Sequence, residues 1–383
     1  MEEELGLTLP MSRLIRYARG EEPAELVFKN GRMVNVFTGE VLPGEVAVAA
    51  GLIVGVGSGY RGRLEVDLAG RYLAPGLIDG HLHLESSLLS PLEFSRAVLP
   101  RGTTTVICDP HEIANVWGAA GVRYLLAASA GLPLSFFFTA PSCVPATPLE
   151  TAGGVIGAGE LEQLLAHPRV LGLAEMMNFP GVLATDREVL SKLETARAGG
   201  WPIDGHCPGL TGRELQAYLA AGADSDHETT SREEALEKLR AGLYLFIREG
   251  STARNLKALL PAVTAVNARR CLLVSDDRQP LDLREQGHLD HCLRRAVEEG
   301  LDPVTALQLV TLNPAERFGL HDRGAVAAGR RADLVVFNDL TAFEVEAVYS
   351  GGWPVGEVAP AGPAADQIFS PPAGAVHVAW DRL

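Results

Sequence analysis

A chain of 383 residues with 47% hydrophobic and 21% charged side chains is long enough for one large domain with a small satellite, and too short for three domains. Its 48 acidic residues outnumber the 33 basic ones, and the formal net charge of −15 would repel nucleic-acid phosphates and anionic lipid surfaces. This balance argues against nucleic acid as a partner, and the size and composition are those of an ordinary soluble enzyme.

The N-terminal segment does not resemble an export signal. Residues 1–20 include three consecutive glutamates and lack the apolar core of a signal peptide. The longest apolar runs, such as 132–140, fall well short of the ~20 residues that a membrane-spanning helix needs. The cysteines form no CxxC pair, which argues against a disulfide framework and against a thiolate zinc site. We therefore expect a cytoplasmic protein with no membrane association.

Residues 25–73 alternate short β-type runs with glycine turns such as Asn30-Gly31, a pattern typical of a small β module. Further β-type runs lie near the other end of the chain, at 332–338 and 345–349. Because sheets built from both termini are a common way to close a domain, we expect these runs to complete the same module. The predicted domain boundaries are 1–74 for the first part of the β module, 75–320 for the central domain, and 321–383 for the second part and tail.

Between the two parts of the β module, short apolar runs alternate with helical stretches, as expected of parallel βα units. Eight such runs imply a closed barrel: 77–83, 103–108, 135–139, 170–176, 202–206, 223–227, 243–247 and 271–275. A doubly wound open sheet is the alternative, but no GxGxxG motif follows the first run. The predicted fold is an α/β, (β/α)8 TIM-like barrel with a small discontinuous β-sandwich domain built from both chain ends.

Residues with metal-ligand chemistry stand where these runs end. His81 and His83 are separated by one residue, so both imidazoles point to the same face of a strand and can chelate one ion. Such a pair by itself is more often two exposed polar side chains, and a lone histidine is more often a core residue. Other runs, however, end in further candidates: Glu175, His206, His227 and the pair Asp276-Asp277. Because barrel active sites lie at the C-terminal strand ends, we expect one shared metal site.

Further polar groups stand near these candidates. Glu85 follows the first run and is able to touch a ligand or to hold a histidine in its tautomer. The expected loop after the second run carries four polar side chains: Asp109, His111, Glu112 and Asn115. Two explanations fit these residues equally well. They bind a ligand, or they have a purely structural role as a loop cap or an ion-pair network. Arg248 and Glu249 follow the seventh run and are expected to pair with each other only.

Several motifs resemble the adenine deaminases of the amidohydrolase superfamily, over roughly residues 25–339. The opening Pro75-Gly-Leu-Ile-Asp-Gly-His-Leu-His83 is typical of the superfamily as a whole. The segments Asp109-Pro-His-Glu-Ile-Ala-Asn-Val116 and Ala174-Glu-Met-Met-Asn178 are similar to adenine deaminases in particular. Shorter matching segments are Pro141-Ser-Cys-Val-Pro145, Asp204-Gly-His206, Ser225-Asp-His-Glu228, Ile247-Arg-Glu-Gly-Ser251 and Ser275-Asp-Asp-Arg278.

The resemblance implies a site for two divalent metal ions, of manganese or iron, and a ligand set without thiolates is also compatible with zinc. The implied ligands are His81 and His83 for one ion, His206 and His227 for the other, Glu175 as the bridge, and Asp276. Many relatives bridge their metals with a carboxylated lysine instead, but none of the four lysines of this chain ends a predicted strand.

The implied reaction is hydrolysis of adenine to hypoxanthine and ammonia, in which a metal-activated hydroxide attacks C6. Glu175 and Asp276 are the implied catalytic residues, and Asp276 would carry protons to ring N1 and to the leaving ammonia. Asp277 is the fallback, because strand ends predicted from sequence can be wrong by a few residues. The structural alternative for both residues is an acid in a turn or at a helix N-cap. Glu85 and the four polar residues after the second run would bind the purine.

The sequence departs from the adenine deaminases in two respects. The adenine deaminases carry a further domain after the β module, and the residues up to Leu383 do not include it. In addition, Cys207 stands where alanine is usual, and Gln279 stands where histidine is usual. The alternatives are therefore an amidohydrolase for another aminopurine, a dihydroorotase-like enzyme for a cyclic amide, and a non-catalytic metal-binding barrel. The absence of a lysine bridge argues against the second, and the complete ligand set argues against the third. The sequence is compatible with a homodimer.

Overall fold

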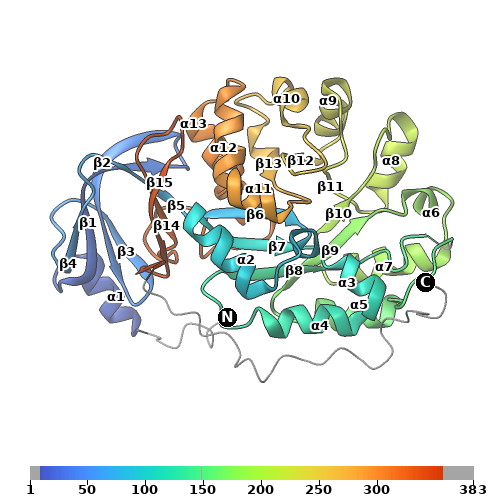
Figure 1. The fold of residues 1–383 in the computed structure, drawn as a ribbon, viewed down its shortest axis with the longest axis horizontal. Helices are drawn as coiled ribbons and strands as arrows, with labels where there is room; N and C mark the ends of the chain where they lie inside the picture. Colours follow the sequence, from blue (N-terminus) through green and yellow to red (C-terminus); the bar gives the residue numbers. More distant parts are fainter. Residues whose placement is uncertain (1–8, 148, 357–383) are drawn as a thin grey trace.

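The computed structural model describes residues 9–147 and 149–356, which form a barrel and a sheet packed beside it (Figure 1). The barrel consists of the parallel strands β6 (Leu77–Leu82), β7 (Thr103–Cys108), β8 (Ser135–Ala140), β9 (Val170–Met176), β10 (Ile203–Gly205), β11 (Ser225–Asp226), β12 (Tyr244–Arg248) and β13 (Cys271–Val274). All eight predicted runs are confirmed, with bounds within two residues of those expected.

The barrel strands pair in two parallel groups, in the orders β10-β9-β8-β7-β6 and β11-β12-β13. Backbone hydrogen bonds join the two groups at both seams. Asp224 N donates to Ile203 O between β10 and β11, and Asp276 N donates to His81 O between β13 and β6, both at 3.1 Å. The parallel sheet therefore curls into a TIM-barrel-like fold.

The strands are apolar because the barrel buries both of their faces. Every residue of β6, β7 and β13 is buried. Helices cover the outer face, and the inner face is filled by side chains from several strands, among them Ile78, Ile107, Phe246 and Leu272. These side chains form a packed floor, so that the polar residues at the strand ends sit above an apolar core rather than over a channel.

Helices alternate with the strands and lie outside them (Figure 1). They are α2 (Pro91–Val98), α3 (His111–Trp117), α4 (Ala119–Ala128), α5 (Ala158–Leu165), α6 (Phe179–Leu183), α7 (Arg187–Ala198), α8 (Gly212–Ala220), α9 (Arg232–Arg240), α10 (Leu256–Leu259), α11 (Pro280–Glu285), α12 (Leu289–Glu298), α13 (Pro303–Leu309) and α14 (Leu312–Arg317). Ser90, Asp186 and Ser231 start α2, α7 and α9 by accepting hydrogen bonds from first-turn N–H groups. Within the described residues, none of the helices has the length and apolar character needed to cross a bilayer.

The sheet beside the barrel is built from strands near both ends of the described chain. Its strands are β1 (Ala24–Asn35), β2 (Glu40–Ala49), β3 (Leu52–Gly57), β4 (Gly62–Asp67), β5 (Tyr72–Pro75), β14 (Leu334–Phe337), β15 (Val345–Ser350) and β16 (Trp353–Pro354). Helix α1 (Met11–Ala18) contacts β3. β5 pairs antiparallel with β14 and leads through Gly76 directly into β6. The sheet is thereby anchored at the first strand of the barrel.

The turn expected at Asn30-Gly31 is wrong, because β1 runs through it as one strand with a bulge between Phe28 and Gly31. Asn30 takes a φ of 55°, which asparagine tolerates better than most residues. A Cβ on Gly31 would lie 2.3 Å from Leu68 Cδ1, so the glycine permits a close approach rather than a reversal of the chain.

Candidate metal centre

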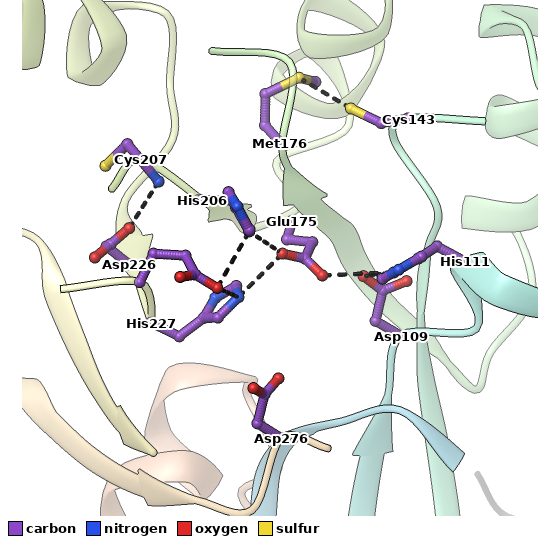
Figure 2. A network of polar contacts seen from close by, with 12 residues as sticks. Asp109, His111, Cys143, Glu175, Met176, His206, Cys207, Asp226, His227 and Asp276 are labelled. Carbon is purple, nitrogen blue, oxygen red and sulfur yellow. Dashed lines mark hydrogen bonds and ion pairs between the residues drawn. The ribbon is translucent and has the colours of Figure 1, made fainter. Parts of the chain in front are cut away.

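Glu175, at the end of β9, lies at the centre of a cluster of histidines and carboxylates at the C-terminal strand ends (Figure 2). Its Oε2 atom contacts His206 Nδ1 and lies 3.0 Å from His227 Nε2. Its Oε1 atom lies 3.5 Å from His83 Nε2. One carboxylate therefore faces imidazoles from three different strand ends, an arrangement suited to holding a divalent cation.

Asp276 completes the cluster on the side of the first strand. Its Oδ1 atom lies 3.4 Å from His81 Nε2 and 3.3 Å from His83 Nε2. The residue has a φ of 54°, a left-handed conformation that aspartate adopts more readily than most residues, and this turn after β13 directs its carboxylate inward. The neighbouring Asp277 instead accepts hydrogen bonds from the hydroxyls of Ser86 and Thr252. The structure thus brings all six predicted ligands together, and it also places a carboxylate oxygen of Asp277 within 4.8 Å of ligand atoms of His83 and Glu112.

Glu228, which was not among the predicted site residues, also belongs to the cluster. Its Oε1 atom lies 3.6 Å from His227 Nε2 and 3.8 Å from His206 Nδ1. These three residues place ligand atoms within 4.8 Å of one another, as do His81, His83 and Asp276. The sequence signals for Glu228 were its position next to a predicted ligand and its place in the matching segment Ser225-Asp-His-Glu228.

The expectation that Arg248 pairs with Glu249 is wrong. Arg248 Nη1 donates to Asp276 Oδ2 at 3.1 Å, and Nη2 donates to Glu228 Oε2 at 2.9 Å. The Glu249 carboxylate lies 4.0 Å from Arg295 instead. Successive side chains of a strand point to opposite faces, so Arg248 and Glu249, at the end of β12, diverge.

Burial disfavours charge in this cluster, but opposite charges outweigh it. Burial raises the pKa of Glu175. His227, His206 and His83 lower it by more than burial raises it, so the pKa of Glu175 lies well below the usual range. Burial lowers the pKa of His83, whereas Asp276, Glu112 and Glu175 raise it well above the usual value. The carboxylates therefore stay ionised and attract positive charge, carried either by protons or by metal ions.

The residues present fit bound divalent cations. His81 Nε2, His227 Nδ1 and Asp109 Oδ1 are buried and lack a hydrogen-bond partner, which is rare for buried polar atoms. The donor set of imidazole nitrogens and carboxylate oxygens suits manganese, iron or zinc. Cys143, which Figure 2 labels, contacts Met176 Sδ at 3.7 Å, and none of the candidate metal groups of the described residues includes a cysteine. A divalent metal cofactor at these strand ends follows from this chemistry.

The segment after β7 is a helix, so the loop expected there is wrong. Helix α3 begins directly after Pro110 and ends before Gly118, whose φ of 59° suits glycine. His111 Nδ1 lies 3.1 Å from Asp109 Oδ2 and 3.4 Å from Glu175 Oε1, so His111 joins the metal cluster. Proline before and glycine after the helix were the signals that could have revealed it.

The other predicted binding residues form a wall beside the cluster. Glu85 Oε1 accepts a hydrogen bond from Ile113 N at 3.1 Å, which ties the loop after β6 to α3. Glu85 Oε2, Glu112 Oε2 and Asn115 Oδ1 are buried without a hydrogen-bond partner. This wall therefore offers polar atoms that the fold itself does not satisfy, although the Asp109–His111 pair shows that an ion-pair network is also present.

A buried ion pair supports the strand end that carries His227. Lys238 Nζ, on α9, donates to Asp226 Oδ2 at 3.0 Å, to Glu234 Oε1 at 2.6 Å and to Cys207 O at 2.7 Å. The side chains of Lys238 and Asp226 are both fully buried. Since a buried charge that loses its partner is costly, this pair should matter for stability as well as for the position of His227.

Replacing Lys238 by methionine is expected to lower the free energy of unfolding by about 3–5 kcal/mol, because Asp226 is left buried and uncompensated. Urea denaturation of the metal-free protein measures the change. Lys257→Met is the control, since the Lys257 side chain is 78% exposed and should change stability by about 0.5 kcal/mol or less. Equal effects of the two substitutions would contradict the prediction.

Comparison with known proteins places this site in a family. The sequence model of the amidohydrolase family matches residues 72–355. The chain is 53% identical over 340 residues to an adenine deaminase of Desulfatibacillum aliphaticivorans, covering 89% of this chain and 60% of that protein. It is 51% identical over 343 residues to an adenine deaminase of Archaeoglobus fulgidus, again over 89% of this chain and 60% of that protein. The chain thus spans about 60% of the length of these relatives.

Solved structures agree on the fold. A β-aspartyl dipeptidase of Fervidobacterium islandicum AW-1 superposes with a TM-score of 0.63 at 19% identity, covering 86% of this chain and 96% of that chain. An adenosine deaminase of Xanthomonas campestris with bound zinc gives a TM-score of 0.59 at 17% identity, covering 87% and 93%. At these identities the likeness concerns the fold alone. The family match extends from β5 through every barrel strand to β16, and the chain therefore belongs to the amidohydrolase family.

Proposed function

We propose that this protein is an adenine deaminase that hydrolyses adenine to hypoxanthine and ammonia. The observation that carries the proposal is the convergence of histidines from three strand ends on Glu175. The chain that builds this site is about half identical to proteins named adenine deaminase over some nine-tenths of its length. The motifs after β7 and β9, which resemble that family, lie at the cluster.

We propose that the site holds two divalent ions, of manganese or iron, with zinc as the alternative. The proposed ligands are His81, His83 and Asp276 on one side, His206 and His227 on the other, and Glu175 between them. When bound, such ions lower the pKa of a water molecule toward about 7 and so supply a strong nucleophile at neutral pH. The buried and unpartnered His81 Nε2 supports this assignment.

Asp276 is the proposed proton carrier. Burial raises its pKa, but the neighbouring imidazoles of His81 and His83 lower it to well below the usual value, so the carboxylate is ionised. It would take the proton of the attacking water and pass it to purine N1, which gains charge as C6 becomes tetrahedral. It would then move the hydroxyl proton at C6 to the departing amine, so that ammonia leaves and the C6 carbonyl forms.

The wall formed by Glu85, Glu112 and Asn115, together with Asp109 and His111, is the proposed purine-binding surface. Burial and the neighbouring Glu112 raise the pKa of Glu85 to about 7, so Glu85 is able to donate as well as accept at neutral pH. Burial lowers the pKa of His111, but Asp109 raises it to about 9, which makes this imidazole a donor. The unpartnered oxygens of the wall support hydrogen bonding to purine edges.

We further propose that the sheet beside the barrel is a small β-sandwich domain and that the barrel domain comprises residues 75–320. The predicted bounds of the β-sandwich domain are 1–74 and 321–383, of which 1–8 and 357–383 lie outside the described residues. The pairing of β5 with β14 supports this division. The free cysteines of the described residues support a reducing, cytoplasmic location. The homodimer remains a prediction from sequence.

The experiment that tests the function compares substrates and metals. Chelator-treated protein is reloaded with Mn²⁺, Fe²⁺ or Zn²⁺ and incubated with adenine, adenosine, other aminopurines and dihydroorotate. We expect ammonia release and the ultraviolet change of hypoxanthine formation with adenine, no turnover by the metal-free protein, and two ions per active chain by elemental analysis. Turnover of dihydroorotate alone would favour the cyclic-amide alternative, and bound metal without turnover of any substrate would favour a non-catalytic barrel.

A further inference from the structure

Arg248 joins two carboxylates that lie on either side of it in the barrel. It stands at the end of β12 and is 6% exposed, while Glu228 follows β11 and Asp276 follows β13. Its Nη1 atom donates to Asp276 Oδ2 at 3.1 Å and to Glu228 Oε1, and its Nη2 atom donates to Glu228 Oε2 at 2.9 Å. One planar guanidinium thus contacts three carboxylate oxygens from two neighbouring strand ends.

The contacts of Arg248 determine which oxygen of Asp276 is left for the cation site. Arg248 occupies Oδ2, whereas Oδ1 lies 3.3–3.4 Å from the imidazoles of His81 and His83. The donors of a guanidinium have a rigid geometry, so this contact fixes the plane of the carboxylate as well as its position. Without it, the Asp276 carboxylate would be free to rotate about its side-chain torsions.

Glu228 is held in a similar way. Both of its oxygens contact Arg248, and its Oε1 atom also lies 3.6 Å from His227 Nε2. The positive charge of Arg248 offsets the negative charge of Glu228, which is partly buried beside the histidines. If Arg248 were removed, Glu228 would be drawn toward these imidazoles and any cation they hold.

We propose that Arg248 is a positioning residue for the deamination, and that it fixes the Asp276 carboxylate for proton transfer while it keeps Glu228 from competing for the metal site. The inference rests on the proposed function. In this role Arg248 needs no contact with substrate or metal, because it acts through Asp276 and Glu228.

Arg317, the last residue of α14, provides a matched comparison within the barrel. It is 7% exposed, and its Nη2 atom donates to Asp204 Oδ1 at 3.0 Å and to Asp224 Oδ1 at 2.6 Å. Asp224 precedes β11, whereas Glu228 follows it, and Asp204 lies within β10, so Arg317 joins two strands before their C-terminal ends. Both arginines are buried and bridge two acids, but only Arg248 contacts residues of the cluster.

The test uses the full chain, saturated with Mn²⁺, as Arg248→Met, Arg248→Lys, Arg248→Ala and Arg317→Met. We expect Arg248→Met to lower kcat for adenine by about 10–100-fold, with KM changed less than about threefold and two ions still bound. Lysine should recover part of the loss because it keeps the charge. Arg317→Met should reduce stability but leave kcat within about threefold of the wild type, because the two acids that Arg317 contacts are not residues of the cluster.

Chemical rescue separates positioning from a purely structural role. Guanidinium ion, added well below denaturing concentrations, should restore part of kcat to Arg248→Ala, in which the lost side chain leaves room for it. It should not rescue Arg248→Met, whose side chain fills that space. If the methionine variant fails to fold, the lysine variant and the rescued alanine variant decide the question.

Three outcomes would overturn the proposal: wild-type kcat in Arg248→Met, rescue of the methionine variant to the same extent as alanine, or an equal loss of kcat in Arg317→Met. If the wild type itself does not deaminate adenine, the proposed function fails separately. The electron paramagnetic resonance spectrum of bound Mn²⁺ then tests Arg248 without substrate. The spectrum should change in Arg248→Met and stay the same in Arg317→Met, and an unchanged spectrum in both would overturn the positioning role.

Discussion

Replacing Glu175 by glutamine is expected to abolish turnover by releasing metal. The amide has nearly the same shape but only one acceptor oxygen and no charge, whereas the carboxylate of Glu175 faces His83, His206 and His227 with two oxygens. Loss of the metal removes several kcal/mol of transition-state stabilisation, which corresponds to a fall in kcat of about a thousandfold or more. Ammonia release and elemental analysis measure the two effects on the same samples.

The same substitution at Glu194 is the control, because Glu194 lies exposed on α7 and its variant should keep both metal and activity. His81→Ala should behave like Glu175→Gln, since it removes an imidazole that faces Asp276. A Glu175→Gln protein that retains two ions and near-normal turnover would remove Glu175 from the centre of the proposed site.

Asp276→Asn is expected to keep its metal but to lose about 10²–10⁴-fold in kcat, the range usual for a general acid–base group. An asparagine oxygen is still able to face His81 and His83, and the other proposed ligands are unchanged, so metal content should persist. The amide cannot accept and return a proton, so protonation of N1 and of the leaving amine should stall. Steady-state kinetics with adenine and elemental analysis together distinguish this from loss of metal.

Asp277→Asn is the informative comparison for this variant. The Asp277 carboxylate accepts hydrogen bonds from Ser86 and Thr252, so its substitution should disturb the loop after β13 and cost much less activity than Asp276→Asn. Wild-type-like turnover in Asp276→Asn, or a larger loss in Asp277→Asn, would transfer the proton-carrier role away from Asp276.

The barrel was predictable because parallel strands covered on both faces must be continuous apolar runs. The bounds expected for 103–108 and 170–176 match β7 and β9 at both ends. The convergence of His81 and Glu175 followed from the same reasoning, since the carboxyl ends of such strands share one mouth. Periodicity and strand ends therefore led to the ring of predicted ligands before any long-range contact was known.

Features that depend on local geometry between neighbours were missed. Glu228 follows His227 directly, and in a regular strand the two side chains would point to opposite faces. β11, however, spans only Ser225–Asp226, so both residues lie beyond the strand and face the cluster. The partners of Arg248 could not be predicted either, because they follow β11 and β13 and are fixed only when the barrel closes.

The seam at which the barrel closes is made by residues of the metal cluster themselves. The backbone of Asp276 donates to the carbonyl of His81, and the side chains of the same two residues face each other above that bond. A cation held there would act as a clasp between the first and the last strand of the ring. Folding and metal uptake would then be thermodynamically linked, so that removing the metal with a chelator would lower the stability of the whole barrel.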